Sequence, residues 1–379
     1  LTIGAAPPAR DLDSLLVEKL DAPIGQHALR RVLRPNGSVI IVVSDSFRKT
    51  AIHVVLPGLI RYLNASNVSN DAIAFLVATG THRPPTAEEK AEILGEAIYD
   101  RFQSRIFCHD PDDEENLVHC GTTSRSTPVY INRHAMVADT VIATGTTVLH
   151  YFGGFGGGRK SIVPGIAGRK TIAANHALNL DAHENRLNPD VRIGRLDGNP
   201  VAEDMLEGSR FCNVDFMINT VLNQDGAIAG LFCGDLEAAH RQACAFAESL
   251  YAVPIRKKAD FVIASAGKAK NFIQSHKTLY NAFQVVKPGG PIILATPASE
   301  GYGGNKFEAW LGLKTPDAII AALREHAEIN GQTALSTIEK ARNAILITAM
   351  RSEDVEGLGA VKARDLADAL DRVRNRLNP

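Results

Sequence analysis

A single loop of this chain gathers residue types that can do chemistry together. Residues 150–161 read HYFGGFGGGRKS, so a histidine, five glycines and Lys160 lie in one short segment, and His176 follows sixteen residues after that lysine. Glycine lets the backbone approach a ligand closely because it has no Cβ atom. A lysine amine can bind phosphate or act as a nucleophile, and a histidine can move protons or bind a metal. The combination predicts a functional site.

The loop is similar in composition to the phosphate-binding loop of nucleotide-binding enzymes, whose motif is G-x-x-x-x-G-K-[ST]. Here Arg159 separates Gly158 from Lys160, and Pro164-Gly165 disfavour the helix that should follow. The spacing therefore argues against a nucleotide loop of this kind. A glycine nest for phosphate and a flexible structural turn both remain open. The structural turn does not explain why two histidines and a lysine occur with it.

Polar residues also follow two predicted strands. Asp45 and Arg48 come after the apolar run at 38–43 (SVIIVV), and His82 comes after the run at 71–78 (DAIAFLVA). An arginine can hold a carboxylate or a phosphate with two parallel hydrogen bonds. Loops at strand ends often carry function. Solvated surface residues are the alternative interpretation of both clusters.

A further polar cluster precedes a helix predicted over 275–286. Gln274 and Lys277 lie there, after a strand predicted at 259–264. The N-terminus of a helix favours anions, and the charge of Lys277 adds to this effect. An exposed helix start without a function is the alternative.

Short apolar runs alternate with helical patterns along the chain, which predicts an α/β fold with mainly parallel, buried sheets. A capping box at Thr86–Glu89 opens one helix, and Asn223–Gly226 joins two strands as a hairpin. We predict two α/β domains with an active-site cleft between them, because open α/β sheets bind ligands beyond the carboxyl ends of their strands. The boundaries are 1–253 for an N-terminal cofactor-binding domain, 254–360 for a C-terminal domain, and 361–379 for a C-terminal helix that can return to the first domain. Strands are predicted at 38–43, 71–78, 139–144, 214–222, 227–232, 259–264, 291–295 and 343–348, and helices at 51–63, 234–251, 275–286, 316–326 and 363–377.

Composition excludes several classes of protein. The 379 residues contain 41 Lys and Arg against 42 Asp and Glu, so the basic excess of a nucleic-acid-binding protein is missing. No segment approaches the ~20 apolar residues of a membrane span, and the N-terminus does not resemble a signal peptide. The five scattered cysteines do not suggest a disulfide framework. We therefore expect a cytoplasmic protein that binds neither nucleic acid nor membrane.

Two Cys/His pairs form a second candidate metal site. Cys108-His109 and His119-Cys120 could together supply four zinc ligands. Their spacing matches no standard zinc motif, so the acidic segment 110–115 between them is better interpreted as a solvated surface.

Together these motifs resemble the lactate racemase family, over a span from about Asp21 to near the C-terminus. The resemblance rests on residues 150–161 with Pro164-Gly165-Ile166-Ala167 and Asn175-His176, on Thr79–Pro84, on Asp45 and Arg48, on Gln274 and Lys277, and on Gly301-Tyr302-Gly303-Gly304.

The resemblance implies a cofactor and the residues that hold it. That family uses a nickel-pincer nucleotide, a pyridinium mononucleotide with two sulfur-containing arms and a carbon-bound nickel. Lys160 would tether it covalently through its amine, and His176 would be the protein ligand to nickel. Asp45 and the loop glycines Gly154, Gly156, Gly157 and Gly158 would help to hold it. The cofactor-synthesis proteins would be cellular partners, and protein made without them is expected to lack the cofactor.

The resemblance also implies a reaction, the inversion of C2 in a 2-hydroxy acid. Hydride moves from C2 to the cofactor and returns to the opposite face of a 2-keto acid, which avoids removing a very weakly acidic C–H proton. His82 and His150 would be the acid/base pair. Arg48 would hold the substrate carboxylate, with Gln274 and Lys277 assisting.

Departures from the family pattern bear on the substrate. His276 lies between Gln274 and Lys277, and Asn305-Lys306 follow Gly303-Gly304, so the pocket is expected to be more polar. We therefore expect a 2-hydroxy acid that is larger or more polar than lactate, such as a sugar acid. The alternatives are a nucleotide-dependent phosphotransferase that uses the glycine-rich loop, and a non-catalytic protein that binds a small acid.

Overall fold

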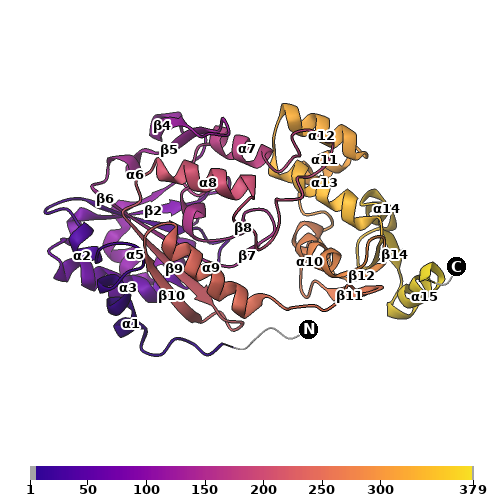
Figure 1. Ribbon diagram of the computed structural model, residues 1–379, viewed down its shortest axis with the longest axis horizontal. Coiled ribbons are helices and arrows are strands. Elements are labelled where there is room, and N and C mark those ends of the chain that lie inside the picture. Colours follow the sequence, from indigo (N-terminus) through magenta and orange to yellow (C-terminus); the bar gives the residue numbers. More distant parts are fainter. Residues whose placement is uncertain (1–5, 378–379) are drawn as a thin grey trace. The chain divides into compact units, whose positions relative to one another are not determined.

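The computed structural model describes residues 6–377, which form two compact units (Figure 1). Unit 1 comprises Leu1–Asn175 and Asp190–Val253, and unit 2 comprises His176–Pro189 and Pro254–Pro379. The chain thus enters unit 2 at His176, returns to unit 1 at Asp190, and leaves again at Pro254. The sequence prediction placed all of 1–253 in one domain, because no local pattern marks the excursion over 176–189.

Unit 1 is built on a six-stranded sheet with the order β10-β9-β6-β1-β2-β3. Neighbouring strands are parallel except β9 and β10, which form the predicted antiparallel hairpin. All but the last residue of β1 are buried, as expected of a parallel strand covered on both faces. The strands are β1 (Val39–Ser44), β2 (Ile73–Ala78), β3 (Ile106–Cys108), β6 (Thr140–Thr146), β9 (Phe216–Leu222) and β10 (Ile228–Gly234).

Helices α1 (Leu12–Asp21) and α3 (Ile52–Ala65) share one hydrophobic core with alternate residues of β1 and β2. Helix α4 (Ala87–Leu94) begins with the predicted capping box of Thr86 and Glu89. Helix α9 (Ala238–Tyr251) packs on β9 and β10. The remaining elements are α2 (Leu29–Val32), α5 (Glu96–Phe102), α6 (Arg133–Val137), α7 (Arg169–Ala177), α8 (Pro200–Arg210), and the two-stranded pairs β4 (Leu117–Thr122) with β5 (Pro128–Asn132) and β7 (Leu149–His150) with β8 (Gly154–Phe155).

Unit 2 contains a parallel four-stranded sheet in the order β11-β12-β13-β14. The strands are Val262–Ser265, Ile292–Ala295, Ala344–Ile347 and Val361–Ala363, and the helices are α10 (Phe272–Val285), α11 (Asn305–Leu311), α12 (Pro316–Glu325), α13 (Ile329–Ala341), α14 (Ser352–Gly357) and α15 (Leu366–Leu377). Helix α15 packs through Ala369 and Val373 on Ile293 and Ile345 of this sheet. It therefore stays in unit 2 rather than returning to the first domain. Both units confirm the predicted α/β fold class.

The strand order of unit 1 has a functional consequence. Strand β1 lies between β2 on one side and β6 on the other, and all three run parallel. The chain therefore leaves β1 and β6 in opposite directions, which makes their carboxyl ends the topological switch point where open α/β sheets bind ligands. The loops that begin at Asp45, Thr79 and Thr147 all lie at this edge.

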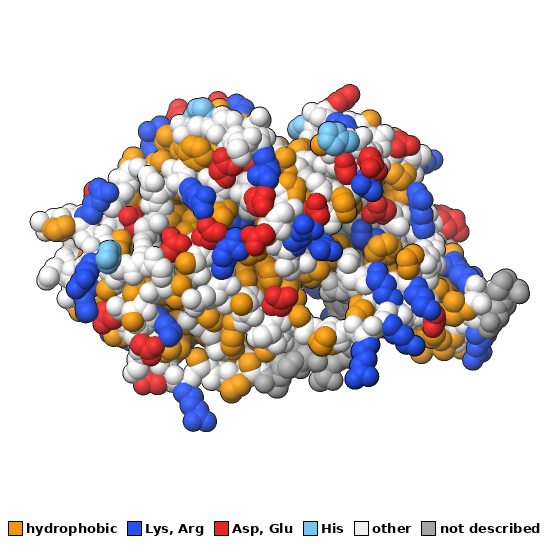
Figure 2. Space-filling model, in the orientation of Figure 1, with side chains coloured by type: hydrophobic (Ala, Val, Ile, Leu, Met, Phe, Trp, Pro, Cys, Tyr) orange, Lys and Arg blue, Asp and Glu red, His pale blue; other side chains and the backbone are white. Residues whose placement is uncertain are grey.

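The surface carries charges of both signs. On the face shown in Figure 2, lysine and arginine side chains are interspersed with aspartate and glutamate, and the formal net charge is −1. In the part of the chain that the structure describes, no helix combines the length and the apolar character needed to cross a membrane.

Candidate functional site

Two of the predicted site residues, His82 and Asp45, are in direct contact. The Nδ1 atom of His82 lies 2.6 Å from Oδ2 of Asp45. Asp45 is 2% exposed, whereas the side chain of His82 is 40% exposed. The parallel register that pairs Ser44 with Ala78 brings the two loops together. The family resemblance implies that Asp45 helps to hold the cofactor, and the structure gives this carboxylate a partner that the local sequence pattern did not indicate.

The loop that carries His82 is braced by an ion pair that sequence reasoning missed. Arg83 donates two hydrogen bonds to Glu89, each 2.6 Å long. This arginine, followed by the Thr86 backbone N–H, lowers the pKa of Glu89 to about 2. Because Glu89 also completes the capping box of α4, the loop is held at the helix that follows it.

Lys160 has an amine suited to nucleophilic chemistry. Burial, followed by the positive charges of Arg48 and Arg159, lowers the pKa of Lys160 well below its ordinary value. A Cβ atom added at Gly153 would lie 3.7 Å from Nζ, so the amine lies against that glycine. A neutral amine is the reactive form of lysine. Arg48 itself is exposed, yet its charge acts on Lys160. Arg48 and Lys160 are therefore a second pair of predicted site residues that lie near one another.

Arg159, which interrupts the nucleotide-loop motif, has a structural role instead. It is 3% exposed. Its guanidinium donates to the carbonyl oxygens of Gly153 and Ala202 at 2.5 and 3.0 Å, and Nη1 lies 3.3 Å from Nδ1 of His240. Burial lowers the pKa of Arg159 to about 10. The buried guanidinium of Arg159 therefore holds the backbone of the loop in place. We expect the chemistry from the next residue, Lys160.

Packing within unit 1 is enough to explain why glycine occupies the four positions predicted to bind the cofactor. A Cβ at Gly154 would lie 2.0 Å from the carbonyl oxygen of Arg195, and one at Gly158 would lie 2.3 Å from Cγ of His240. Both glycines have positive φ. The carbonyl of Gly156 accepts from His240, and a Cβ at Gly157 would lie 2.8 Å from Oγ1 of Thr147. These four glycines therefore carry no independent argument for a ligand.

His240 provides a test of this packing through the pH dependence of stability. Burial, followed by the charge of Arg159, lowers the pKa of His240 from 6.5 to about 3. Above pH 6.5 the ring is neutral in both the folded and the unfolded state. Between pH 6.5 and 3 only the unfolded state binds the proton, so stability falls as the pH falls. We expect the loss between pH 7 and pH 4 to be about 3 kcal/mol larger for the wild type than for His240→Gln.

Urea unfolding at the two pH values measures this difference. The exposed His27, replaced as His27→Gln, is the matched control and should keep the pH dependence of the wild type. An equal loss in the wild type and in His240→Gln would contradict the assignment.

A buried carboxylate fixes the helix that ends near His176. Asp204 is 1% exposed and accepts hydrogen bonds from the hydroxyls of Thr123 (2.5 Å) and Thr127 (2.9 Å) and from Nδ2 of Asn175 (2.8 Å). Asn175 also donates to the carbonyl of Val201 at 3.1 Å. Sequence reasoning missed Asp204, because its partners lie up to 81 positions away.

We expect Asp204→Ala to destabilise unit 1 by about 3–5 kcal/mol, since three buried donors would lose their acceptor. Glu203→Ala removes the adjacent carboxylate, which pairs with Arg125 at the surface, and should cost less than about 1 kcal/mol. Chemical unfolding of the two variants checks the contrast, and similar losses would contradict it.

His176, the predicted metal ligand, is in the last turn of α7 and is 5% exposed. Its carbonyl accepts hydrogen bonds from Asn179 N at 3.1 Å and from Nε2 of Gln332. Among residues 6–377, no group of three or more histidine, cysteine, aspartate or glutamate side chains could hold a metal ion.

The alternative zinc cluster is not formed. His109 is 2% exposed, and its ring nitrogens lie 3.0 Å from the carbonyl oxygen of Ala167 and 3.2 Å from Nδ2 of Asn132. Burial also lowers its pKa. This histidine belongs to the core of unit 1.

His150 lies in β7 and pairs with Gly154 of β8. The backbone N–H groups of Phe152 and Gly153 donate to its Nδ1 atom at 3.2 and 3.1 Å. The short turn between the two strands therefore determines how the imidazole is held.

Unit 2 carries the predicted residues Gln274 and Lys277, both exposed on α10. A separation of three places them on the same side of the helix. Asn271 caps the helix, and Oε1 of Gln274 accepts from the backbone of Lys270 at 3.0 Å. His276 between them is 1% exposed and lies 3.1 Å from the hydroxyl of Ser336. The expectation that His276 makes the pocket more polar is therefore not supported.

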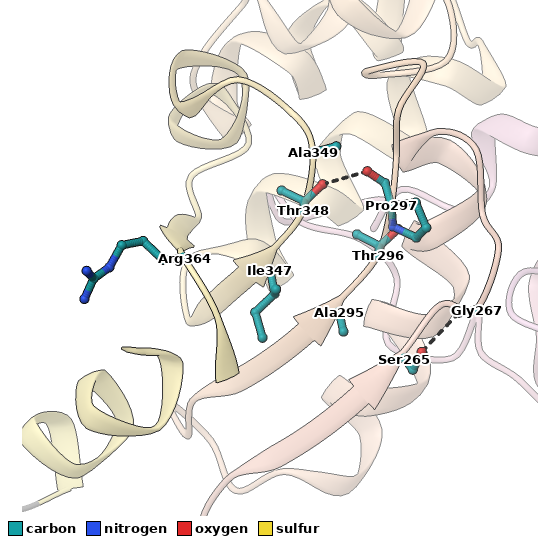
Figure 3. Close-up of a pocket in the computed structure, with 9 residues that line it drawn as sticks. All are labelled: Ser265, Gly267, Ala295, Thr296, Pro297, Ile347, Thr348, Ala349 and Arg364. Carbon is teal, nitrogen blue, oxygen red and sulfur yellow. Dashed lines mark hydrogen bonds between the residues drawn. The ribbon is translucent and has the colours of Figure 1, made fainter. Parts of the chain in front are cut away.

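A pocket of about 380 Å³ lies at the carboxyl ends of β11, β12 and β13 (Figure 3). Its polar groups have protein partners, since Thr348 donates to the carbonyl of Pro297, Ser265 accepts from Gly267, and Thr296 bonds to Ser275. Arg364, which also lines the pocket, forms an ion pair with Asp368 at 3.5 Å. None of the predicted site residues lines this pocket.

Comparisons with known proteins bear directly on this site. A family model described as the lactate racemase N-terminal domain matches residues 2–188. A lactate racemase of Lactiplantibacillus plantarum is 38% identical over 296 residues, which cover 77% of this chain and 68% of that protein. A lactate racemase of Thermoanaerobacterium thermosaccharolyticum is 33% identical over 301 residues, which cover 79% of this chain and 68% of that protein.

Solved structures extend the similarity to the whole fold. The lactate racemase apoprotein of T. thermosaccharolyticum has a TM-score of 0.87 and 29% identity, covering 99% of this chain and 90% of its own. A Thermotoga maritima protein shares the fold, with a TM-score of 0.70, 20% identity, and coverage of 96% and 93%. Since the resemblance seen in the sequence motifs is confirmed by relatives above 30% identity over two thirds of their length, this chain belongs to the lactate racemase family and is an enzyme of the isomerase class.

Proposed function

We propose that this enzyme inverts C2 of a 2-hydroxy acid with a nickel-pincer nucleotide bound at the carboxyl edge of the unit 1 sheet. The observation that carries the proposal is the arrangement at the switch point. A carboxylate–imidazole pair, Asp45 and His82, lies on one side of it, and a lysine with a lowered pKa, Lys160, follows β6 on the other. The relatives that are named lactate racemases support the same class of substrate.

The residues present fit the cofactor. Lys160 offers an amine with a lowered pKa beside Gly153, which has no side chain, and this suits a covalent tether. His176, 5% exposed in the last turn of α7, offers one imidazole ligand, which suits a nickel ion held mainly by its organic frame. When bound, the cofactor would supply a hydride acceptor for C2 of the substrate.

The side chains of this enzyme would supply binding and proton transfer. Arg48 is exposed, and its positive charge contributes to the lowered pKa of Lys160. Its planar guanidinium can bind a carboxylate through two parallel hydrogen bonds. Gln274 and Lys277 of unit 2 are proposed as further substrate ligands. His82, oriented by Asp45, would exchange the proton of the substrate hydroxyl, and His150 would face the same oxygen. The expectation of a sugar acid now rests on Asn305 and Lys306 alone, because His276 is buried.

The geometry argues against the phosphotransferase. The glycine-rich loop continues into a single 3-10 turn, Gly158–Ser161, rather than into an α-helix. The N–H of Gly158 is already bound by Oδ1 of Asn219 at 2.9 Å. A phosphate would therefore find neither the helix N-terminus nor this backbone donor that a nucleotide loop supplies.

The test uses protein produced together with the cofactor-synthesis proteins. Single enantiomers of lactate, of larger 2-hydroxy acids and of sugar acids are supplied in deuterated water, and the products are separated by chiral chromatography. We expect the opposite configuration at C2 to form without deuterium at C2, because hydride returns to the carbon it left. Binding of these acids by nickel-loaded protein without inversion would favour the non-catalytic alternative and overturn the proposal.

A further inference from the structure

An exposed aromatic side chain lies beside His82. Phe47 is 55% exposed, whereas every other phenylalanine in residues 6–377 is at least half-buried. The ring centroid of Phe47 lies 4.6 Å from that of His82, and the two rings are inclined by 47°. Single apolar side chains on a surface are common and need no function. This one, however, packs on a residue that is expected to do chemistry, so its exposed surface borders the proposed site.

The ring of Phe47 is held by its surroundings within unit 1. The backbone N–H of Arg48 donates to the carbonyl oxygen of Asp45 at 3.2 Å and closes a turn that contains Phe47. The guanidinium carbon of Arg83 lies 5.4 Å from the centroid of the ring, close enough for a cation–π attraction. Arg83 is itself fixed by its two hydrogen bonds to Glu89. The ring is therefore positioned before a ligand arrives, which lowers the entropy lost on binding.

The position of the ring indicates which part of a substrate would meet it. In the proposed function, Arg48 binds the carboxylate and His82 exchanges the hydroxyl proton. Phe47 is next to Arg48 in the chain and packs on His82, so a 2-hydroxy acid held by both residues lies beside Phe47. Its carboxylate and hydroxyl are then occupied, and its C2–H bond must face the hydride acceptor. The substituent on C2 is the part left to contact the aromatic ring.

We infer that Phe47 is a specificity-determining residue and that the substrate is a 2-hydroxy acid with a large apolar side chain on C2. This inference deepens the proposed function and rests on it. An apolar substituent placed on the ring removes the surface of both from water, which favours binding. A sugar acid carries a hydroxyl group on each carbon of its chain, and the ring of Phe47 offers these groups no hydrogen bond.

The residues that favoured a sugar acid give it little support. His276 is buried, and Nζ of Lys306 lies 3.6 Å from a carboxylate oxygen of Glu328. The charge of Lys306 therefore already has a partner within unit 2. Phe47, in contrast, contacts a proposed catalytic residue directly.

The first test measures substrate preference in cofactor-loaded enzyme. Single enantiomers of lactate, 3-phenyl-2-hydroxypropanoate and gluconate are compared by kcat/KM for inversion at C2. We expect the wild type to favour the phenyl substrate over lactate by at least about ten-fold, since even one methylene in an apolar pocket is worth that much. Phe47→Ala should remove this preference, while its kcat/KM for lactate changes little. Phe47→Leu keeps a large apolar side chain and should retain most of the preference.

The ratio of the two kcat/KM values separates specificity from support of His82. If Phe47 only positioned His82, Phe47→Ala would slow both substrates equally, and that result would overturn the inference. A wild type that prefers lactate or gluconate would overturn it as well. Val54→Ala is the matched control, because Val54 is an exposed apolar residue of α3, and it should keep the ratio of the wild type.

The second test measures binding without turnover. Protein labelled with ¹³C in its phenylalanine rings is titrated with the same acids, and the signal of Phe47 is assigned by its loss in Phe47→Leu. We expect 3-phenyl-2-hydroxypropanoate to shift this signal and gluconate to leave it unchanged. Arg48→Ala should abolish the shift at the same concentration, because the carboxylate loses its partner.

Two results of the titration would contradict the inference. These are the absence of a shift in both cofactor-free and cofactor-loaded protein, and a shift that persists in Arg48→Ala. If the loaded wild type inverts no 2-hydroxy acid, the proposed function fails, while the spectra still decide whether Phe47 contacts an apolar side chain.

Discussion

Replacing His82 by alanine should reduce the interconversion of 2-hydroxy-acid enantiomers by about 10²–10⁴-fold while the cofactor remains attached to Lys160. The reason is that His82 is the imidazole with a buried carboxylate at Nδ1, and its own side chain is 40% exposed toward solvent. Loss of a general base lowers the rate of the chemical step without removing the groups that bind the cofactor. Initial rates in both directions, together with intact mass and nickel content, measure the two effects separately.

His53→Ala is the matched control, since His53 is an exposed histidine of α3 outside the site. It should leave turnover unchanged. Asp45→Asn tests the positioning role, because its effect should disappear when His82 is already absent. Additive losses in the double variant Asp45→Asn/His82→Ala would show that Asp45 acts independently of His82. A His82→Ala enzyme with full turnover would remove this histidine from the mechanism.

Replacing Lys160 by alanine should prevent covalent attachment of the cofactor and lower turnover to the level of cofactor-free protein. The structure supports this expectation, because burial and the charges of Arg48 and Arg159 favour the neutral amine of Lys160. Protein produced with the cofactor-synthesis proteins is examined by intact mass spectrometry, peptide mapping and nickel analysis. The wild type should show an added mass on the peptide that contains Lys160, and Lys160→Ala should show none.

Two controls separate chemistry from charge. Lys160→Arg keeps a positive charge but has no nucleophilic amine, so it should also lack the added mass. Lys170→Ala removes a lysine at the surface, paired with Glu114 at 3.4 Å, and should load normally. An added mass on another residue, or full loading of Lys160→Arg, would contradict the tether.

Much of the architecture could be predicted because its signals are local. The apolar runs of β1, β2 and β6 mark buried parallel strands. Parallel strands align their carboxyl ends, so Asp45, His82 and the glycine-rich loop had to meet at one edge of the sheet. The capping box at Thr86 and the hairpin at Asn223 are also local, since each is a contact among neighbours in sequence. For the same reason, motifs in these loops were enough to indicate the family.

Only the tertiary structure decided which side chains pair with the residues of these loops. Asp45 contacts His82 from 37 positions away, and Asn175 is held by Asp204 from 29 positions away. Arg159 became a buried support and His276 a buried core residue, although both stand beside residues expected to do chemistry. Hydrogen bonds of this kind depend on how distant segments pack, which the spacing of residues along the chain does not reveal. The sequence by itself therefore determined the fold class, the family and the loops in which chemistry is expected, and only the packing decided which distant partners hold the residues of those loops.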